Sequence, residues 1–433
     1  MKLRSRLRVS HKHYRQVPNW GIPLIYSVAA VVAGLTVPRL EDALLPEYVA
    51  SVSAGSATAI YSAIASGMIA LTGIVFSLAF VMVQFSATAY SPRLVLWIAR
   101  DPVMSHAMGM FTATFLYALA ALAWVDRRGS GRVGFFGMWF VMVLLLASMA
   151  MFVALIQRIG VLQINRILQF IGDPGRKVIE NMYPPLETPR ESGGPEQPAA
   201  GAVTQTVTYT GRPQALQSVD VDALLALAEQ CNGFVEVDCC VGDTMIDGST
   251  ILRVYGGRKN IAEQTWRDAF QFGDERNYEQ DPKYAIRLLV DVAIKALSPA
   301  VNDPTTAVQA LDLIEDLLRR LGRKRLEIGE FRDESGTLRV VVPFPTWEDF
   351  LALAFDEIRF CGGTSVQVMR RLKALLGDLI STSPQERLEA LRRQQKLLDS
   401  TVTRSFTDAE DKMSASVEDR QGLGIPRKPR AST

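Results

Sequence analysis

Histidine and cysteine, which catalytic and metal sites often use, are scarce in this sequence. It contains only 3 histidines among 433 residues, and the last of them is His106. No GxSxG elbow, P-loop, HExxH pair or zinc-ligand spacing is present, so the commonest hydrolase, nucleotide-phosphate and zinc motifs are excluded. We therefore expect no enzyme and no cofactor, although carboxylates such as Asp291, Asp303 and Asp312 are available if they converge.

The 4 cysteines form no CxxC pair, and all of them follow residue 230. Cys239 and Cys240 are adjacent, so on a strand they would point to opposite faces, and neither a metal site nor a disulfide framework is indicated. Reduced thiols are typical of a cytosolic domain. The net charge of +2 gives no reason to expect a nucleic-acid partner.

Apolar segments concentrate before residue 160 and predict four membrane spans. The expected spans are Trp20–Val37, Ala57–Tyr90, Met104–Val125 and Val133–Ile156. The first 19 residues contain lysines and arginines but no acid, which places both termini in the cytoplasm by the positive-inside rule. The turn Asp126–Arg132 contains three arginines although alternation puts it outside, so its side of the membrane stays open.

The second span is the stretch around which the chain is organised. It is uncharged from Ala57 to Tyr90 and would extend about 50 Å as a helix, which exceeds a bilayer core. At about 100° per residue, small and polar residues follow one line along it: Ser62, Ser66, Gly73, Ser77, Gln84 and Thr88. Unsatisfied polar groups in hydrocarbon are costly, so this stripe must contact protein or water. Three interpretations remain: a seam with another helix, a water-filled path lined by several copies, or a site for a lipid or small ligand.

The fold class expected is an α-helical membrane domain of four spans followed by a cytosolic α+β region. The predicted parts are a basic cytoplasmic leader (1–19), a four-helix transmembrane domain (20–157), a juxtamembrane amphipathic helix (158–182), a linker (183–202), a small β module (203–258), a helical domain (259–406) and a disordered tail (407–433). Within the β module, residues 241–254 resemble the hairpin of barrel-sandwich domains such as biotinyl and lipoyl carriers. No suitably placed lysine is present for modification, so a structural or docking module is expected.

The helical domain has clear helix starts. Asp281-Pro282 and Asp303-Pro304 each combine an N-cap residue with proline at the first helical position. Between them, the run ALSPAVNDP predicts a rigid bend that contains Ser298, Pro299 and Asn302. We expect these residues to form a structural junction between two helices and not a binding site.

Three segments together support a family resemblance. They are TGIVFSLAFVMVQFSATAYSPRLV, VGDTMIDGSTILRV and EQDPKYAIRLLVDVAIKALSPAVNDPTTAVQALD. From about Trp20 to Ser400 the chain resembles a bacterial family of predicted inner-membrane proteins, domain of unknown function 2254. The resemblance implies a multi-pass inner-membrane protein with a cytosolic domain, and it carries no known activity.

Two functions follow from these patterns. The first is an oligomeric channel-like pore that the second span lines and the cytosolic domain gates. The alternative is a non-conducting sensor or scaffold in the bilayer, whose cytosolic domain binds a partner protein or ligand. The absence of charge within the spans argues against an ion-coupled transporter. The ion, solute, stimulus and number of copies are not indicated.

Overall fold

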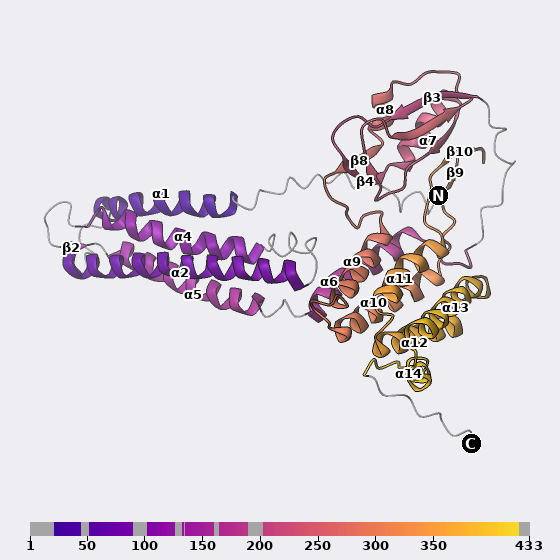
Figure 1. Ribbon diagram of the computed structural model, residues 1–433. Helices are drawn as coiled ribbons and strands as arrows, with labels where there is room; N and C mark the ends of the chain where they lie inside the picture. Colours follow the sequence, from indigo (N-terminus) through magenta and orange to yellow (C-terminus); the bar gives the residue numbers. More distant parts are fainter. Residues whose placement is uncertain are drawn as a thin grey trace. The chain divides into compact units, whose positions relative to one another are not determined.

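A computed structural model describes residues 21–44, 52–89, 102–125, 132–133, 135–159, 164–188 and 202–423. These residues form two compact units, one ending at Gln163 and the other beginning at Ile164 (Figure 1). The expected leader, 1–19, and most of the expected linker, 183–202, lie outside the described residues.

The described residues of the first unit include four apolar helices, each long enough to cross a bilayer. They are α1 (Gly21–Leu44), α2 (Ala54–Ala89), α4 (Pro102–Leu122) and α5 (Phe135–Ile159). Helix α4 is central, because it packs against all three of the others and fully buries Phe111 and Tyr117. The expectation of four apolar helices of membrane-spanning length is confirmed.

The end of α1 and the starts of α2 and α5 lie together. Glu41 of α1 accepts hydrogen bonds from the backbone N–H groups of Phe136 (2.8 Å) and Gly137 (3.2 Å) at the start of α5. A carboxylate is favourable there because the first N–H groups of a helix have no partner within it. The short strands β1 (Val52–Ser53) and β2 (Arg132–Val133), which precede α2 and α5, pair antiparallel. The direction of the helices therefore alternates along the chain, as expected.

The second unit contains two β-sheets. Five strands form one sheet in the order β3 (Val203–Thr208), β7 (Thr250–Tyr255), β5 (Phe234–Val237), β10 (Leu338–Val341) and β9 (Glu330–Arg332). Three strands form the other: β6 (Thr244–Met245), β4 (Gln214–Val219) and β8 (Phe270–Gly273). Buried and partly exposed residues alternate along β5, as expected of a strand with one face in a core. Helices α7 (Val221–Cys231) and α8 (Glu263–Arg267) accompany these sheets.

The remaining helices of this unit pack beside one another (Figure 1). They are α6 (Ile164–Met182), α9 (Pro282–Ala296), α10 (Pro304–Gly322), α11 (Trp347–Cys361), α12 (Val366–Thr382), α13 (Leu388–Ser405) and α14 (Ala409–Ala415). Their starts follow local chemistry: Asp303 accepts a bond from the Thr306 N–H (3.1 Å), and Thr346 with Asp349 forms a capping box.

The β structure differs from the sequence expectation in two ways. Strands β6 and β7 join different sheets, so residues 241–254 do not form the expected barrel-sandwich hairpin. Strands β9 and β10 also complete the larger sheet from within the expected helical domain, 259–406, because β10 pairs in parallel with β5. Such long-range pairing leaves no local signal in the sequence.

Two further boundaries are corrected. The expected tail, 407–433, contains α14, and Ala415 and Asp419 beyond its start are buried. Arg370 of α12 holds this segment by donating to the Ser414 carbonyl (2.5 Å) and hydroxyl (2.8 Å). The amphipathic helix expected at 158–182 begins at Ile164 as α6, and its apolar side packs against α9 and α10.

Candidate functional site

The predicted stripe on α2 faces away from the other three spans. The side of α2 that packs on α4 buries Tyr61, Ile64 and Met68, which lie opposite the stripe at helical spacing. Among the stripe residues, Ser62 is half-buried, whereas Ser66, Gly73, Ser77 and Gln84 are exposed in the single chain. The side chain of Thr88 lies outside the described ones. Apart from the adjoining backbone of α2 itself, no described atom lies within 4 Å of the point where a Cβ on Gly73 would stand.

The predicted junction residues separate into two places at opposite ends of α9. Asp281 and Pro282 stand at its start, and Ser298, Pro299, Asn302, Asp303 and Pro304 form the turn into α10. In this turn the Ser298 hydroxyl donates to the Lys295 carbonyl (2.7 Å), and Asn302 adopts φ 49°. Asparagine tolerates this left-handed conformation better than most residues. The turn is therefore held by its own backbone and side-chain bonds.

Asp281 has a different environment from the one that its sequence position suggests. Its side chain makes no capping bond, is 1% exposed, and lies 4.0 Å from the Arg276 guanidinium, which itself donates to the Gly242 carbonyl (2.7 Å). Burial raises the pKa of Asp281, and Arg276 and Lys283 oppose that rise. The hydroxyl of Tyr183 is likewise buried without a hydrogen-bond partner among the described residues. These buried polar groups stand where the β strands meet the helices of this unit.

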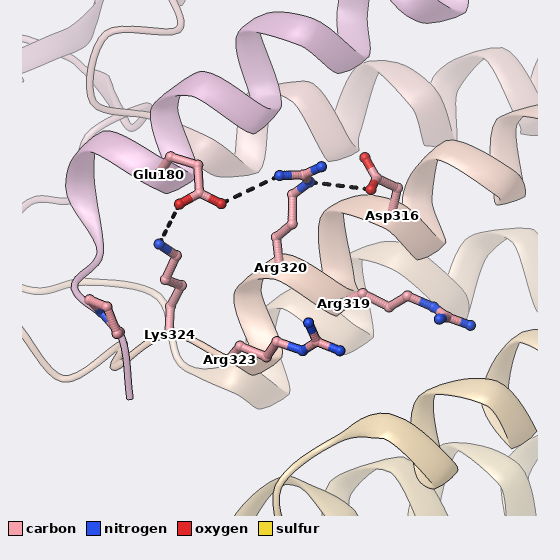
Figure 2. A pocket seen from close by; sticks show the side chains of 7 residues that line it. Glu180, Asp316, Arg319, Arg320, Arg323 and Lys324 are labelled. Atoms are coloured by element: carbon pink, nitrogen blue, oxygen red, sulfur yellow. Dashed lines mark hydrogen bonds and ion pairs between the residues drawn. The ribbon is translucent and has the colours of Figure 1, made fainter. Parts of the chain in front are cut away.

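A charged hollow of about 470 Å³ opens between α6 and the last turn of α10 (Figure 2). Four cationic side chains and two carboxylates line it together with Pro185: Arg319, Arg320, Arg323, Lys324, Glu180 and Asp316. Cations therefore exceed carboxylates by two at its walls.

Ion pairs across the hollow join the two helices. Glu180 of α6 pairs with Lys324 (2.5 Å) and Arg320 (3.4 Å), and Arg320 also pairs with Asp316 (3.2 Å). The hydrogen bond from Lys324 is the main cause that lowers the pKa of Glu180. Arg323 is exposed and has no ion pair within the part of the chain that the structure describes. Its guanidinium is therefore available to an anion from solution.

The sequence showed only half of this hollow. The run RRLGRK at 319–324 is visible as a basic helix end, which is the usual complement to a helix C-terminus. Glu180 comes from a helix 144 residues before Lys324, so no local pattern could bring them together.

The positions and the burial of the possible metal ligands and the four cysteines indicate which chemistry they can support. Within the described ranges, no three His, Cys, Asp or Glu side chains stand close enough to hold a metal ion. Cys231 and Cys239 are buried, Cys240 is half-buried and Cys361 is exposed. Burial is the main cause that raises the pKa of Cys239 to about 12, so this thiol stays protonated and unreactive near neutral pH.

Comparison with known proteins supplies the family. The model of a family described as predicted membrane protein (DUF2254) matches residues 18–378. The chain belongs to this family. Uncharacterized proteins Rv1290c of Mycobacterium tuberculosis and Mb1321c of Mycobacterium bovis are each 26% identical to it over 413 residues, which cover 92% of this chain and 77% of theirs. No solved structure matches the chain.

Proposed function

We propose that this DUF2254 protein is an oligomeric, channel-like protein of the bacterial inner membrane, with both termini in the cytoplasm. Copies of α2 would meet around a water-filled path, and the C-terminal unit would gate it. The proposal assigns no chemical reaction to the protein, no cofactor and no nucleic-acid partner.

The observation that carries this proposal is the exposure of the stripe on α2. Ser66, Gly73 and Ser77 lie on the face that the described residues of the other three spans leave uncovered. A hydroxyl left in hydrocarbon without a partner costs several kcal/mol, so this face is unfavourable against lipid tails. Contact with other copies or with water removes that cost.

The first test replaces Ser77 by leucine in the purified full-length chain. If the stripe lines a wet path, Ser77→Leu should abolish conductance in planar bilayers without changing the oligomer mass in detergent. Ala150→Leu is the matched control, because Ala150 is exposed on α5 among apolar side chains. It should leave both conductance and mass unchanged.

Two results would contradict the channel. One is a wild-type chain that is monomeric and silent in bilayers. The other is a Ser77→Leu chain that fails to assemble while the wild type assembles without conducting, which would identify the stripe as a seam in a scaffold.

The alternative function, a sensor whose C-terminal unit binds a ligand, is favoured by the hollow beside Arg323. Four cations facing two carboxylates suit a small ligand with two or more negative charges, such as a diphosphate group. Calorimetric titration of the full-length chain with inorganic pyrophosphate tests this function. Arg323→Gln should weaken binding about tenfold, corresponding to the loss of one charge-assisted contact.

Arg258→Gln is the control for that titration. Arg258 is also exposed, it belongs to the same unit, and it does not line the hollow. A wild-type chain that shows no heat of binding, or equal affinity in both variants, would contradict the sensor function at this site.

A further inference from the structure

The first residues of α6 lie at one end of the packed helices in the C-terminal unit. Helix α6 runs parallel to α10, because Arg176 pairs with Asp316 (2.6 Å) and Glu180, farther along α6, pairs with Lys324, farther along α10. The starts of α6 and α10 therefore lie at the same end. The turn from α9 into α10, residues 297–303, lies there too.

The last residues of α11 reach this same end. A Cβ on Gly362, directly after α11, would lie 3.2 Å from a methyl carbon of Leu297, at the end of α9. A Cβ on Gly363 would lie 3.2 Å from the Ser405 hydroxyl, so the end of α13 is also close. The ends of three helices and the start of two therefore meet on one surface.

That surface carries apolar side chains that no described residue of its own unit covers. Phe360 of α11 is 82% exposed and Val301 of the turn is 39% exposed, while Pro299 and Ala300 between the helices are also exposed. We call these four residues the apolar tip. Arg404, at the end of α13, adds an exposed positive charge, and Lys295 is partly exposed in the last turn of α9. An exposed phenylalanine beside basic side chains is a pattern typical of proteins that bind the membrane interface.

The covalent connection to the fourth span limits where this end can be. Helix α5 ends at Ile159 and α6 begins at Ile164. The link between these two residues spans at most about 17 Å even when fully extended. The apolar stretch of α5 runs to Gln157, so the start of α6 stays within that reach of the place where the fourth span leaves the hydrocarbon.

We propose that the apolar tip enters the lipid interface, with Phe360 at the boundary between headgroups and acyl chains and with Arg404 and Lys295 at lipid phosphates. The partner is the bilayer surface itself, and anionic lipid strengthens the contact. This contact requires neither conduction nor a ligand in the hollow, so it stands or falls independently of the proposed function.

Cys361, next to Phe360 and exposed, offers a native position for a probe. The full-length Cys240→Ser chain is labelled at Cys361 with a nitroxide and placed in nanodiscs containing phosphatidylglycerol and phosphatidylcholine. Collisions with oxygen, which concentrates in lipid, and with a water-soluble nickel chelate are measured by spin relaxation. The proposal expects oxygen to dominate at position 361.

The matched control places the label at Ser335, which is exposed in the turn between β9 and β10. This position, in a Cys240→Ser, Ser335→Cys, Cys361→Ser chain, should favour the nickel chelate. Phe360→Ser should raise nickel collisions at Cys361 by about threefold, because the apolar anchor of the contact is removed. Since Phe360 is mostly exposed, circular dichroism and size should not change.

Two outcomes would overturn the proposal. Nickel collisions at position 361 equal to those at position 335 would show that the tip lies in water. The second outcome combines short distances between labels on two chains with oxygen collisions that do not change when detergent replaces lipid. This outcome would show that a second copy of the chain covers the apolar tip.

Discussion

Two glycines in α6 show how closely this helix is packed against its neighbours. A Cβ on Gly175 would lie 2.7 Å from the Cβ of Ala285 in α9, a distance that real side chains do not adopt. At Gly172, three residues earlier, the nearest atoms would be 3.6 Å away, which is ordinary contact. Only Gly175 is therefore required by the approach of the two helices.

We expect Gly175→Ala to destabilise the C-terminal unit by about 1–3 kcal/mol, because the extra methyl group must push α6 and α9 apart. Gly172→Ala is its control in the same helix, and it should be neutral or stabilising by up to about 1 kcal/mol, since alanine favours helix. Thermal unfolding of the full chain in detergent measures both. Equal melting temperatures for the two variants would contradict the packing of α6 on α9.

Asp281 gives a prediction about pH. Burial raises its pKa above the ordinary value of 3.8, so the native state keeps the proton to a higher pH than the unfolded chain does. The contribution of this group to stability is therefore fully present below about pH 4 and is lost as pH rises through the native pKa. Asp281→Asn should match the wild type at pH 4 and become the more stable of the two towards pH 7.

Asp333 is the control, because its pKa is shifted in the opposite direction from that of Asp281. Although burial raises its pKa, hydrogen bonds from Ser335, Arg339 and the Thr337 N–H lower it to about 2. Asp333→Asn should therefore be less stable than the wild type at pH 7 and approach it as pH falls from about 4 towards that value. Melting temperatures of the three chains between pH 2.5 and 7.5 test both signs. A parallel pH profile for Asp281→Asn and the wild type would contradict the assigned environment of Asp281.

At the scale of elements, α10 and α12 are joined by an almost buried ion pair. Arg371 of α12 donates to Glu315 (2.5 Å) and Asp312 (2.8 Å) of α10, and the side chains of Arg371 and Glu315 are only 5% and 10% exposed. Breaking a buried pair leaves a charge without compensation, whereas replacing both partners by apolar residues often costs little.

We expect Arg371→Met to destabilise the protein by about 3 kcal/mol, because among the described residues Glu315 then keeps Arg319 alone as an ion-pair partner. The double variant Arg371→Met, Glu315→Leu should recover most of that loss. Unfolding of the wild type, both single variants and the double variant forms a complete mutant cycle. Additive losses in the double variant would mean that the two side chains do not interact energetically.

At the scale of the whole molecule, the open point is the orientation in the membrane. The basic leader favours an orientation with both termini inside, whereas the arginines between α4 and α5 favour the opposite orientation locally. We expect the leader to dominate, because its charges precede the first span. A C-terminal green fluorescent protein fusion should therefore fluoresce, and alkaline phosphatase inserted in the turn 126–132 should be active. A fluorescent protein fusion without fluorescence, together with inactive phosphatase in the turn, would show the opposite orientation.

Local chemistry made part of this protein predictable from its sequence. The four apolar helices were found because length and apolarity are properties of continuous segments. The start of α10 was found because Asp303 bonds backbone only three residues away. The alignment of the stripe on α2 also followed from the helical period. The face on which it lies was not predictable, because that depends on which side of α2 packs on α4.

Only the tertiary structure decided the features that are built from segments far apart in the sequence. The larger sheet takes β9 and β10 from a region that reads as helical, and Asp281 is buried although its sequence position suggests an exposed cap. The hollow joins Glu180 to Lys324, and the apolar tip joins the turn after α9 to the end of α11. The sequence by itself determined the spans and the helix starts, because a few neighbouring residues supply their free energy. Pairing, burial and exposure required the fold, because they arise from contacts between residues more than a hundred positions apart or on separate helices.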